Sequence, residues 1–414
     1  MAGLLALLSF EDDWPIKDFI KYGLESLSHR GEYGVVCFRA SGSVKCVEYS
    51  DSIPSLSGSA IAAWMEEDSR ELQVVERDSS AIIFDRPGKY VDDVANIVDV
   101  ALSSTNIHAK LPKLLDGLTG VDIPSFVALS SRGEIIAWRT NSGLTPLAVG
   151  GYGFDMVITS SESFTIEMLD ADVRRYLSPG EGLYISRNLV KTFRTAPLSR
   201  CGLCLLELLS IARHDSIIDG VNTYEFRKAL GEELGKYLSD QVDVVVGIPE
   251  TATPYAIGLS QYVGAKFETA FIASSRRVRS LLKRELRDRV AIAQLKLSPI
   301  REVLDGKKVA LVDDVVVTGY TLKTASQILR YKVGVSELHV LIASPRIVEP
   351  CPYGIMRLDR GNLIAAHLDD NSIRRFLEVD SITWLREGDL ERVAKAFGIR
   401  LCGRCFGVDF IGGS

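Results

Sequence analysis

Two adjacent aspartates, Asp313 and Asp314, follow directly after a short apolar run. The four residues before them, Val309 to Val312, predict a buried strand of a parallel sheet, and the two carboxylates would stand at its carboxyl end. Carboxylate oxygens accept hydrogen bonds from sugar hydroxyls, and they also bind Mg²⁺. For this pair taken alone, an ordinary strand end with two solvated aspartates is an equal alternative.

The residues after the aspartates could bind an anion. Thr318, Gly319, Tyr320 and Thr321 lead into a helical pattern over residues 322–331. Backbone N–H groups and threonine hydroxyls at a helix start bind phosphate, and a glycine lets the backbone approach the ligand closely. A Walker-type loop would require Gly-Lys-Ser or Gly-Lys-Thr, which this stretch lacks. We therefore expect a strand, a loop and a helix start that face a phosphate.

The second half of the chain has the alternating pattern of an α/β domain. Helices are predicted at 204–213, 224–238 and 254–262, and strands at 242–248 and 338–343. Such alternation indicates a parallel sheet whose ligands bind at the carboxyl ends of the strands. The run 309–321 would supply one of these ends.

The first 190 residues have a different pattern, with paired strands and a few helices. Strands are predicted at 2–10, 34–40, 44–49, 81–84, 126–129, 134–139 and 156–159, and helices at 14–29, 61–65 and 91–103. Hairpins are expected where two strands are joined by a short turn containing glycine. This pattern is typical of an α+β domain, and we place the boundary near Ser199, which gives domains 1–199 and 200–414.

Length and composition set limits on the function. The chain has 414 residues, a formal net charge of −6, 46% hydrophobic and 25% charged residues. These values favour a globular protein of two or more domains that binds a small molecule rather than nucleic acid. The apolar run 3–10 makes a poor signal peptide, and no apolar stretch reaches membrane-spanning length. We expect a cytoplasmic protein, whose seven cysteines are thiols or metal ligands rather than disulfides.

Several segments, in order and across nearly the whole chain, resemble the glutamine amidophosphoribosyltransferase family. They are Gly23–Gly31, Gly143–Leu147, Ser160–Ser163, Ile218–Asn222, Lys296–Pro299, Val309–Thr321 and Pro350–Ile355. The resemblance implies an N-terminal-nucleophile (Ntn) hydrolase-like glutaminase domain followed by a type I phosphoribosyltransferase domain. The implied reaction forms 5-phosphoribosylamine and diphosphate from 5-phosphoribosyl 1-diphosphate (PRPP), in the first committed step of purine synthesis. A homo-oligomer is also implied.

The resemblance assigns roles in the PRPP site. Asp313 and Asp314 would bind the ribose hydroxyls and Mg²⁺, and residues 318–321 would hold the 5′-phosphate. The family's Pro-Asp-Ser-Gly segment, which binds diphosphate and metal, appears as residues 249–252, where Thr251 keeps a hydroxyl. Its flexible basic loop appears at 273–280 without the leading lysine. Arg276 and the arginines that follow it could clamp phosphates or could form a solvated face.

The N-terminal domain departs from the family at three parts of one site. The position of the N-terminal cysteine nucleophile is filled by Ala2, which has no nucleophilic group. No substrate-clamping arginine segment is found between Ser55 and Glu71, and the Asn-Gly oxyanion segment is replaced by residues 84–88. We therefore predict that the glutaminase is inactive and that the domain remains as a scaffold or docking surface.

The cysteines permit two metal sites, and the alternative to both is that they are buried apolar thiols. By spacing alone, Cys201 with Cys204 and Cys402 with Cys405 resemble a structural zinc site. The family resemblance instead maps Cys204, Cys351, Cys402 and Cys405 onto the ligands of a [4Fe–4S] cluster, which needs four thiolates. The cluster would have a structural role. The five histidines, His29 among them, show no ligand spacing and are expected to be packing or surface residues.

Two functions follow from these patterns. The first is an amidophosphoribosyltransferase-like enzyme that uses free ammonia, or ammonia from a separate glutaminase subunit. The alternative is a catalytically silent paralogue that binds PRPP or nucleotides and regulates a partner. This alternative draws on the departures at residues 250–252 and 274–275.

Overall fold

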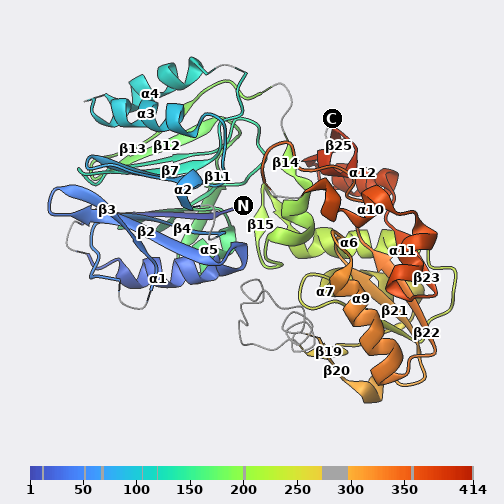
Figure 1. The fold of residues 1–414 in the computed structure, drawn as a ribbon. Helices are drawn as coiled ribbons and strands as arrows, with labels where there is room; N and C mark the ends of the chain where they lie inside the picture. The colour runs from blue at the N-terminus through green and yellow to red at the C-terminus, as the bar shows by residue number, and fades with distance from the viewer. Residues whose placement is uncertain are drawn as a thin grey trace. The chain divides into compact units, whose positions relative to one another are not determined.

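The structure is a computed structural model that describes residues 1–11, 14–50, 53–66, 70–104, 106–118, 120–198, 202–272, 297–355 and 359–412. It divides into two compact units, both drawn in Figure 1. The first unit comprises Met1–Glu207, Asp215–Val221 and Tyr353–Met356, and the second comprises Leu208–His214, Asn222–Pro352 and Arg357–Ser414. Ser199, the expected boundary, lies outside the described residues.

Two antiparallel sheets form the centre of the first unit. The seven-stranded sheet has the order β11 (Asp172–Tyr176), β9 (Ala148–Tyr152), β10 (Met156–Ser160), β1 (Gly3–Ser9), β4 (Ser59–Met65), β2 (Tyr33–Ala40) and β3 (Ser43–Glu48). The six-stranded sheet has the order β13 (Leu189–Arg194), β12 (Glu181–Ser186), β8 (Ile135–Trp138), β7 (Phe126–Ser130), β6 (Ser80–Phe84) and β5 (Val74–Glu76). The hairpins β2–β3 and β7–β8 confirm the two hairpins that the sequence predicts.

The first unit has four layers, helix, sheet, sheet and helix (Figure 1). Successive side chains of a strand point to opposite faces, so Leu4 packs between the two sheets while Leu5 packs on the helical side. On that side lie α1 (Lys17–Ser26) and α5 (Ser163–Met168). The outer face of the second sheet is covered by α3 (Val91–Leu102) and α4 (Ile107–Asp116).

The helix predicted at 61–65 is wrong, because these residues belong to strand β4. All seven residues of β4 are buried, and the strand pairs with β1 on one side and β2 on the other. A strand buried on both faces reads as a continuous apolar run, which periodicity cannot distinguish from a buried helix. The helix α4 and the short helix α2 (Arg70–Gln73) were not predicted.

Cys37 and Cys46 form a disulfide, which contradicts the expectation that all seven cysteines are thiols or metal ligands. The two residues lie directly opposite each other on β2 and β3, with their Cα atoms 4.0 Å apart. Directly opposed residues of an antiparallel pair bring their side chains together. The disulfide depends on the register of the two strands, which an expectation based on a reducing cytoplasm does not take into account.

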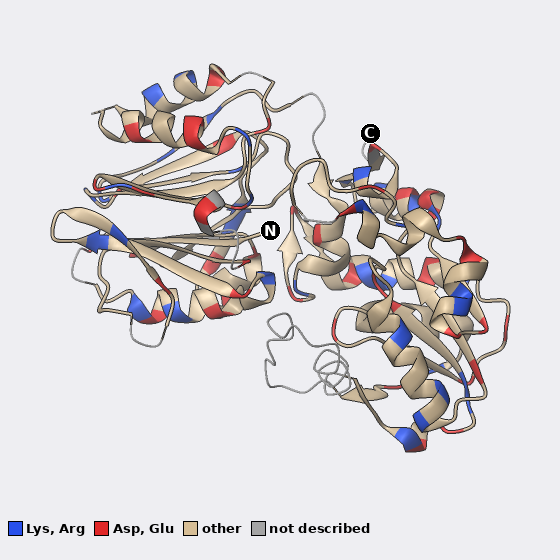
Figure 2. Cartoon of the chain, viewed as in Figure 1, with Lys and Arg blue, Asp and Glu red and all other residues tan. Residues whose placement is uncertain are grey.

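A parallel sheet is the centre of the second unit, as the alternating pattern predicts. Its order is β18 (Lys266–Phe267), β17 (Val244–Gly247), β21 (Lys308–Asp313), β22 (Glu337–Ile342) and β23 (Ser381–Trp384). In Figure 2 these strands are mostly tan, and the charged residues concentrate on helices and loops. The helices of this unit include α6 (Thr223–Gly235), α7 (Thr253–Val263), α9 (Tyr320–Gln327), α10 (Ile364–His367), α11 (Asp370–Leu377) and α12 (Glu387–Ala396).

Glycines bring α6 and α7 unusually close together. A Cβ atom on Gly231 would lie 2.1 Å from the Tyr255 carbonyl oxygen, and one on Gly258 would lie 2.0 Å from that of Lys228. Both neighbours are backbone atoms, so a side chain at either position would force the helices apart. The close contact fixes α7, whose first turn follows the loop after β17.

Smaller elements complete the fold. They are the strand pairs β19 (Phe271–Ile272) with β20 (Ser298–Pro299), and β24 (Arg400–Cys402) with β25 (Phe410–Gly412), together with the strand β14 (Leu203–Cys204) and a π-helix at Glu207–Ile211. The π-helix covers part of the α-helix predicted at 204–213. In the described part of the chain, no helix combines the length and the apolar character needed to cross a bilayer.

Candidate functional site

The strand order of the parallel sheet places a ligand site between β17 and β21. Numbered along the chain, the order is 2-1-3-4-5, so the connections leave in opposite directions from β17 and β21. In such sheets, ligands bind beyond the carboxyl ends of the strands at this switch point. Gly247 at the end of β17 pairs with Val312, one residue before Asp313. The predicted aspartates and the predicted diphosphate loop therefore follow neighbouring strand ends.

Asp313 and Asp314 are both buried at this strand end. Each carboxylate accepts a hydrogen bond from the backbone N–H of the residue that follows it. The Asp314 N–H donates to Asp313 Oδ1 at 3.0 Å, and the Val315 N–H donates to Asp314 Oδ1 at 2.9 Å. Among the described residues, Asp314 Oδ2 is buried and has no hydrogen-bond partner. An unsatisfied buried carboxylate oxygen is costly, so it marks a position where a ligand group or a cation would be favourable.

The electrostatics of the pair support the same conclusion. Burial, and next the neighbouring Asp314 carboxylate, raise the pKa of Asp313 well above its ordinary value. No cation of the described residues contributes to this shift. Two buried carboxylates without a cation are unfavourable in the free protein, and Mg²⁺ or hydroxyl donors would relieve the repulsion.

The loop after the aspartates turns into α9 at Gly319. This residue has φ +76°, and a Cβ atom there would lie 3.2 Å from Ile364 Cδ1 and 3.3 Å from Phe376 Cε1, so glycine suits both the conformation and the space. The first helical bond of α9 runs from the Lys323 N–H to the Gly319 carbonyl at 2.9 Å. The backbone N–H groups of Thr321 and Leu322 come before this bond and have no acceptor within the helix. Such groups can bind an anion.

The threonines and the tyrosine of this loop are accessible. Thr321 and Tyr320 are exposed, with Tyr320 at 68%, and Thr318 is half-buried. The Tyr320 N–H donates weakly to Thr318 Oγ1 at 3.4 Å, and the tyrosine ring packs edge-on against Phe376 at 5.9 Å. The four predicted loop residues thus lie in the turn between the end of β21 and the first turn of α9.

Thr251 lies in the neighbouring loop. Hydrogen bonds from residues that the sequence analysis did not assign to the site support this loop. His214 contacts the Glu250 carbonyl through Nε2 at 3.0 Å, and Arg227 donates to His214 Nδ1 at 2.7 Å. Because the arginine can only donate, Nδ1 is the acceptor and Nε2 carries the proton. Arg227 also donates to the Leu208 and Ala212 carbonyls, so the support is anchored to residues 208–214.

Tyr255 is a second supporting residue. It is fully buried, its hydroxyl donates to the Leu209 carbonyl at 2.8 Å, and burial raises the pKa of the tyrosine. The charges of Asp313 and Asp314 also raise that pKa, which shows that the tyrosine lies near the aspartates. No sequence signal distinguishes Tyr255 from a core aromatic, since the carbonyl to which its hydroxyl donates is 46 residues away. Arg276 lies outside the described residues.

Three of the four predicted cluster cysteines, Cys351, Cys402 and Cys405, belong to the second unit. They lie close enough to affect one another's pKa. Burial, then the nearby Cys351 and Cys402 thiols, raise the pKa of Cys405 to about 12, and burial raises the pKa of Cys402. Cys204 belongs to the first unit, and all four are free of disulfides. Within the described ranges, no group of three or more His, Cys, Asp or Glu side chains is arranged to hold a metal ion.

The first unit holds a buried polar network beside Ala2. The Ala2 N–H donates to the Asp85 carbonyl at 2.7 Å. The next residue, Arg86, is 1% exposed and contacts the Asp85 carboxylate at 3.2 Å and that of Asp122 at 2.7 Å. Burial raises the pKa of Asp85, while the Arg86 guanidinium opposes this shift. An arginine of this chain thus fills the segment in which the family resemblance places the oxyanion residues.

A second buried network surrounds Glu162. The Arg30 Nε donates to Glu162 Oε1 at 2.6 Å, and the same guanidinium pairs with Glu207. His29 Nε2 lies 2.6 Å from Glu162 Oε1, and the Ser216 hydroxyl donates to Oε2 at 2.6 Å. His29 is therefore part of a structural ion-pair network, which agrees with the packing role expected for it.

Comparisons with known proteins match both the sequence and the fold. Residues 222–350 match the family model described as phosphoribosyl transferase domain. The amidophosphoribosyltransferase of Methanothermobacter thermautotrophicus is 33% identical over 289 residues, covering 69% of this chain and 60% of the relative. That of Bacillus subtilis is 32% identical over 282 residues, covering 68% and 59%. The aligned part of the chain thus spans about three fifths of the length of these curated relatives.

Solved structures show the same fold over the whole chain. The glutamine PRPP amidotransferase of B. subtilis, in complex with ADP and GMP, aligns with a TM-score of 0.82 and 24% identity, over 98% of this chain and 97% of that one. A structure described as the allosteric regulatory enzyme of purine biosynthesis also aligns with a TM-score of 0.82, at 23% identity. These similarities are to the fold alone.

Proposed function

Since the chain is a relative of the amidophosphoribosyltransferases and carries a phosphoribosyl transferase domain, we propose that it transfers the phosphoribosyl group of PRPP to ammonia. The products would be 5-phosphoribosylamine and diphosphate, as in the first step of purine synthesis. The observation that carries the proposal is the buried Asp313–Asp314 pair with its unpartnered oxygen, beside the Thr251 loop at the switch point.

Each part of the site has a role in this reaction. The aspartates would bind the ribose hydroxyls and Mg²⁺, the residues 318–321 would hold the 5′-phosphate, and Thr251 would contact the diphosphate and its metal. The bond between the ribose C1 and the diphosphate oxygen breaks, and diphosphate leaves with the electron pair. The ammonia lone pair forms the new C1–N bond, and one proton is then lost. Mg²⁺ supplies charge neutralisation for the leaving diphosphate.

We infer that the first unit does not hydrolyse glutamine. Its four layers agree with the Ntn-hydrolase-like fold that the family resemblance implies, but Ala2 supplies no nucleophile. In the adjacent segment, the buried Arg86 pairs with Asp85 and with the distant Asp122. Ammonia would then come from solution or from a separate glutaminase subunit.

We also propose that Cys204, Cys351, Cys402 and Cys405 hold a [4Fe–4S] cluster with a structural role. None of the four forms a disulfide, and Cys351 and Cys402 both raise the pKa of Cys405, which supports this set. Anaerobically purified protein should be brown and contain iron and acid-labile sulfide, and Cys402→Ser should remove both. Colourless protein that contains zinc instead would contradict the cluster.

The function is tested by measuring diphosphate release from PRPP and Mg²⁺ with ammonium or with glutamine as the nitrogen source. We expect release with ammonium and none above background with glutamine. Equal rates with glutamine would show a working glutaminase. Binding of PRPP without release under either condition would favour the alternative, a silent PRPP- or nucleotide-binding regulator, and no PRPP binding at all would contradict both.

A further inference from the structure

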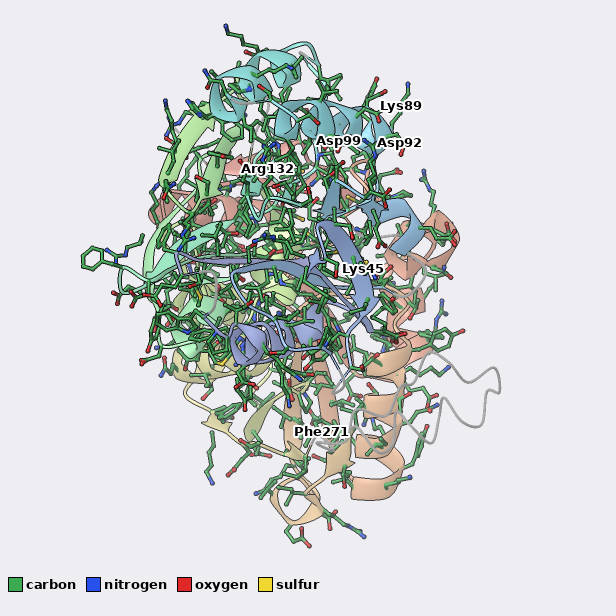
Figure 3. The ribbon with its side chains drawn as sticks, turned by 90° about the vertical axis from the view of Figure 1, so that its left-hand side faces the viewer. Lys45, Lys89, Asp92, Asp99, Arg132 and Phe271 are labelled. Carbon is green, nitrogen blue, oxygen red and sulfur yellow. A yellow bond between two sulfur atoms is a disulfide. The ribbon has the colours of Figure 1, made fainter. Side chains whose placement is uncertain are left out.

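A polar pocket of about 260 Å³ opens at one end of the two sheets of the first unit. Its lining comes from the ends of β1 and β4, from β2, and from the turns between β7 and β8 and between β12 and β13. Figure 3, in which Arg132 is labelled, looks onto this end of the unit. The pocket lies near Ser9, at the opposite end of β1 from Ala2, which is about 20 Å for seven residues of strand. It is therefore distinct from the segment that the family resemblance assigns to glutamine.

Positive charge dominates the lining. Arg39, Arg132 and Arg187 contribute three guanidinium groups, whereas Glu134 is the one carboxylate among the lining residues. Glu134 is already satisfied, because Arg132 contacts it at 2.7 Å and the Tyr184 hydroxyl donates to it at 2.8 Å. The glutamate therefore neutralises Arg132 and leaves the charge of Arg39 without a counterpart.

Two donor groups of the pocket have no partner within the described part of the protein. Among the described residues, the exposed Arg39 side chain has no ion pair or hydrogen bond, although it carries five donors. The Ser59 hydroxyl is buried and also lacks a partner within the described part of the chain. Both groups converge on Gly133, where a Cβ atom would lie 2.9 Å from Arg39 Nη1 and 3.1 Å from Ser59 Oγ. The glycine thus allows donors from two strands to meet at one point.

We propose that this pocket binds a phosphate-class oxyanion, either free phosphate, diphosphate or a phosphoryl ester. Guanidinium forks match the oxygens of phosphate, and hydroxyl donors complete its coordination. Three guanidinium groups against one carboxylate in the lining suit an anion. The volume is below that of pockets for drug-sized ligands, and it has room for phosphate with a few waters.

The test must separate this pocket from the phosphate loop of the second unit. The chain with Thr318→Val and Thr321→Val serves as the background, because these changes weaken the loop and leave the first unit intact. Calorimetric titration with inorganic phosphate, diphosphate and ribose 5-phosphate, at ionic strength held constant with NaCl, then reports the remaining site. We expect binding to persist in this background and to weaken about tenfold or more on adding Arg39→Gln.

Matched variants complete the design. Arg174→Gln removes another exposed arginine of the same unit, 55% exposed on β11, and should leave binding unchanged. Arg39→Lys keeps the charge but loses the fork, so it should bind with intermediate affinity. Loss of all phosphate binding in the background variant would overturn the proposal, as would equal affinity with and without Arg39→Gln. Which of the three anions binds most tightly identifies the source of the phosphoryl group.

Discussion

The two units differ in whether their buried carboxylates have a counter-ion. In the first unit, Glu162 and Glu207 share the guanidinium of Arg30, and a histidine and a serine complete the coordination of Glu162. In the second unit, Asp313 and Asp314 face each other, and none of the described cations pairs with either. The pKa shifts follow this difference. That of Glu162 is lowered, with Arg30 the largest cause acting against its desolvation, and that of Asp313 is raised.

The difference separates structural charges from functional ones. A buried charge that has its counter-ion inside the protein has no need of a ligand, and removing its partner costs stability. A buried charge without a counter-ion destabilises the free protein, and either protonation or a bound cation or hydrogen-bond donor relieves it. By this criterion the Arg30 network of the first unit holds its own counter-ions, and the aspartate pair of the second unit is the candidate binding site.

The largest effect should come from removing the aspartate pair. Asp313→Asn together with Asp314→Asn should lower kcat/KM for PRPP by roughly a hundredfold or more, since the ribose and metal ligands are lost together. The measurement is diphosphate release with ammonium. The control is Asp305→Asn, an exposed residue before the other end of β21, which should change the rate less than about twofold. Unchanged turnover in the double variant would remove the aspartates from the site.

The next largest effect should be on stability, from Arg30→Met. Two buried carboxylates would lose their cation, which typically costs about 3–5 kcal/mol of unfolding free energy. Urea denaturation measures the loss. The matched variant Arg194→Met removes an arginine that is 65% exposed and 3.5 Å from Glu181, and should cost less than about 1 kcal/mol. Equal losses for the two variants would show that burial of the ion pair is unimportant.

The pH dependence of the first unit should report Glu162. Its folded pKa is lowered below the ordinary value for glutamate, so its contribution is fully present above about pH 4.3 and is lost as the pH falls further. Glu162→Gln should therefore destabilise the protein at neutral pH and have a smaller effect in acid. Urea midpoints between neutral and acid pH test this prediction, and a larger effect in acid would contradict it.

Replacing Asp313 should have the smallest effect on stability, and its sign should be opposite to that of replacing Glu162. Its folded pKa is raised, so the folded state holds the proton more tightly than the unfolded state, and wild-type stability declines as the pH rises through the two values. Asp313→Asn should therefore raise the urea midpoint at neutral pH while weakening PRPP binding, and the gain should disappear in acid. A lower midpoint at neutral pH would show that the pair stabilises the free protein.

The secondary structure of residues 309–321 could be predicted because its information is local. The strand, the aspartates, the glycine turn and the helix start of residues 309–321 are adjacent in the chain, and the structure confirms each as an element. The parallel sheet follows from the alternation of strands and helices. Strand β4 was mistaken for a helix because burial on both faces removes the periodic signal.

The supporting residues could not be predicted because their partners are distant in the chain. Arg86 meets Asp122 across 36 positions, and Tyr255 meets the Leu209 carbonyl across 46. Such pairs depend on the way the sheets and helices pack, which composition and spacing do not specify. The Cys37–Cys46 disulfide depends in the same way on the register of two strands. The pocket near Ser9 likewise gathers residues from five separate segments.

The interleaving of the two units along the chain limits how this protein can be divided by genetic means. Residues 215–221 belong to the first unit and supply Ser216 to Glu162 and Asp219 to Arg139, at 2.6 Å in each case. Residues 208–214, just before them, belong to the second unit and carry the histidine behind the diphosphate loop. A gene cut anywhere in this stretch would deprive one product of its own parts. Separating the two units into two complete gene products would therefore need more than one cut.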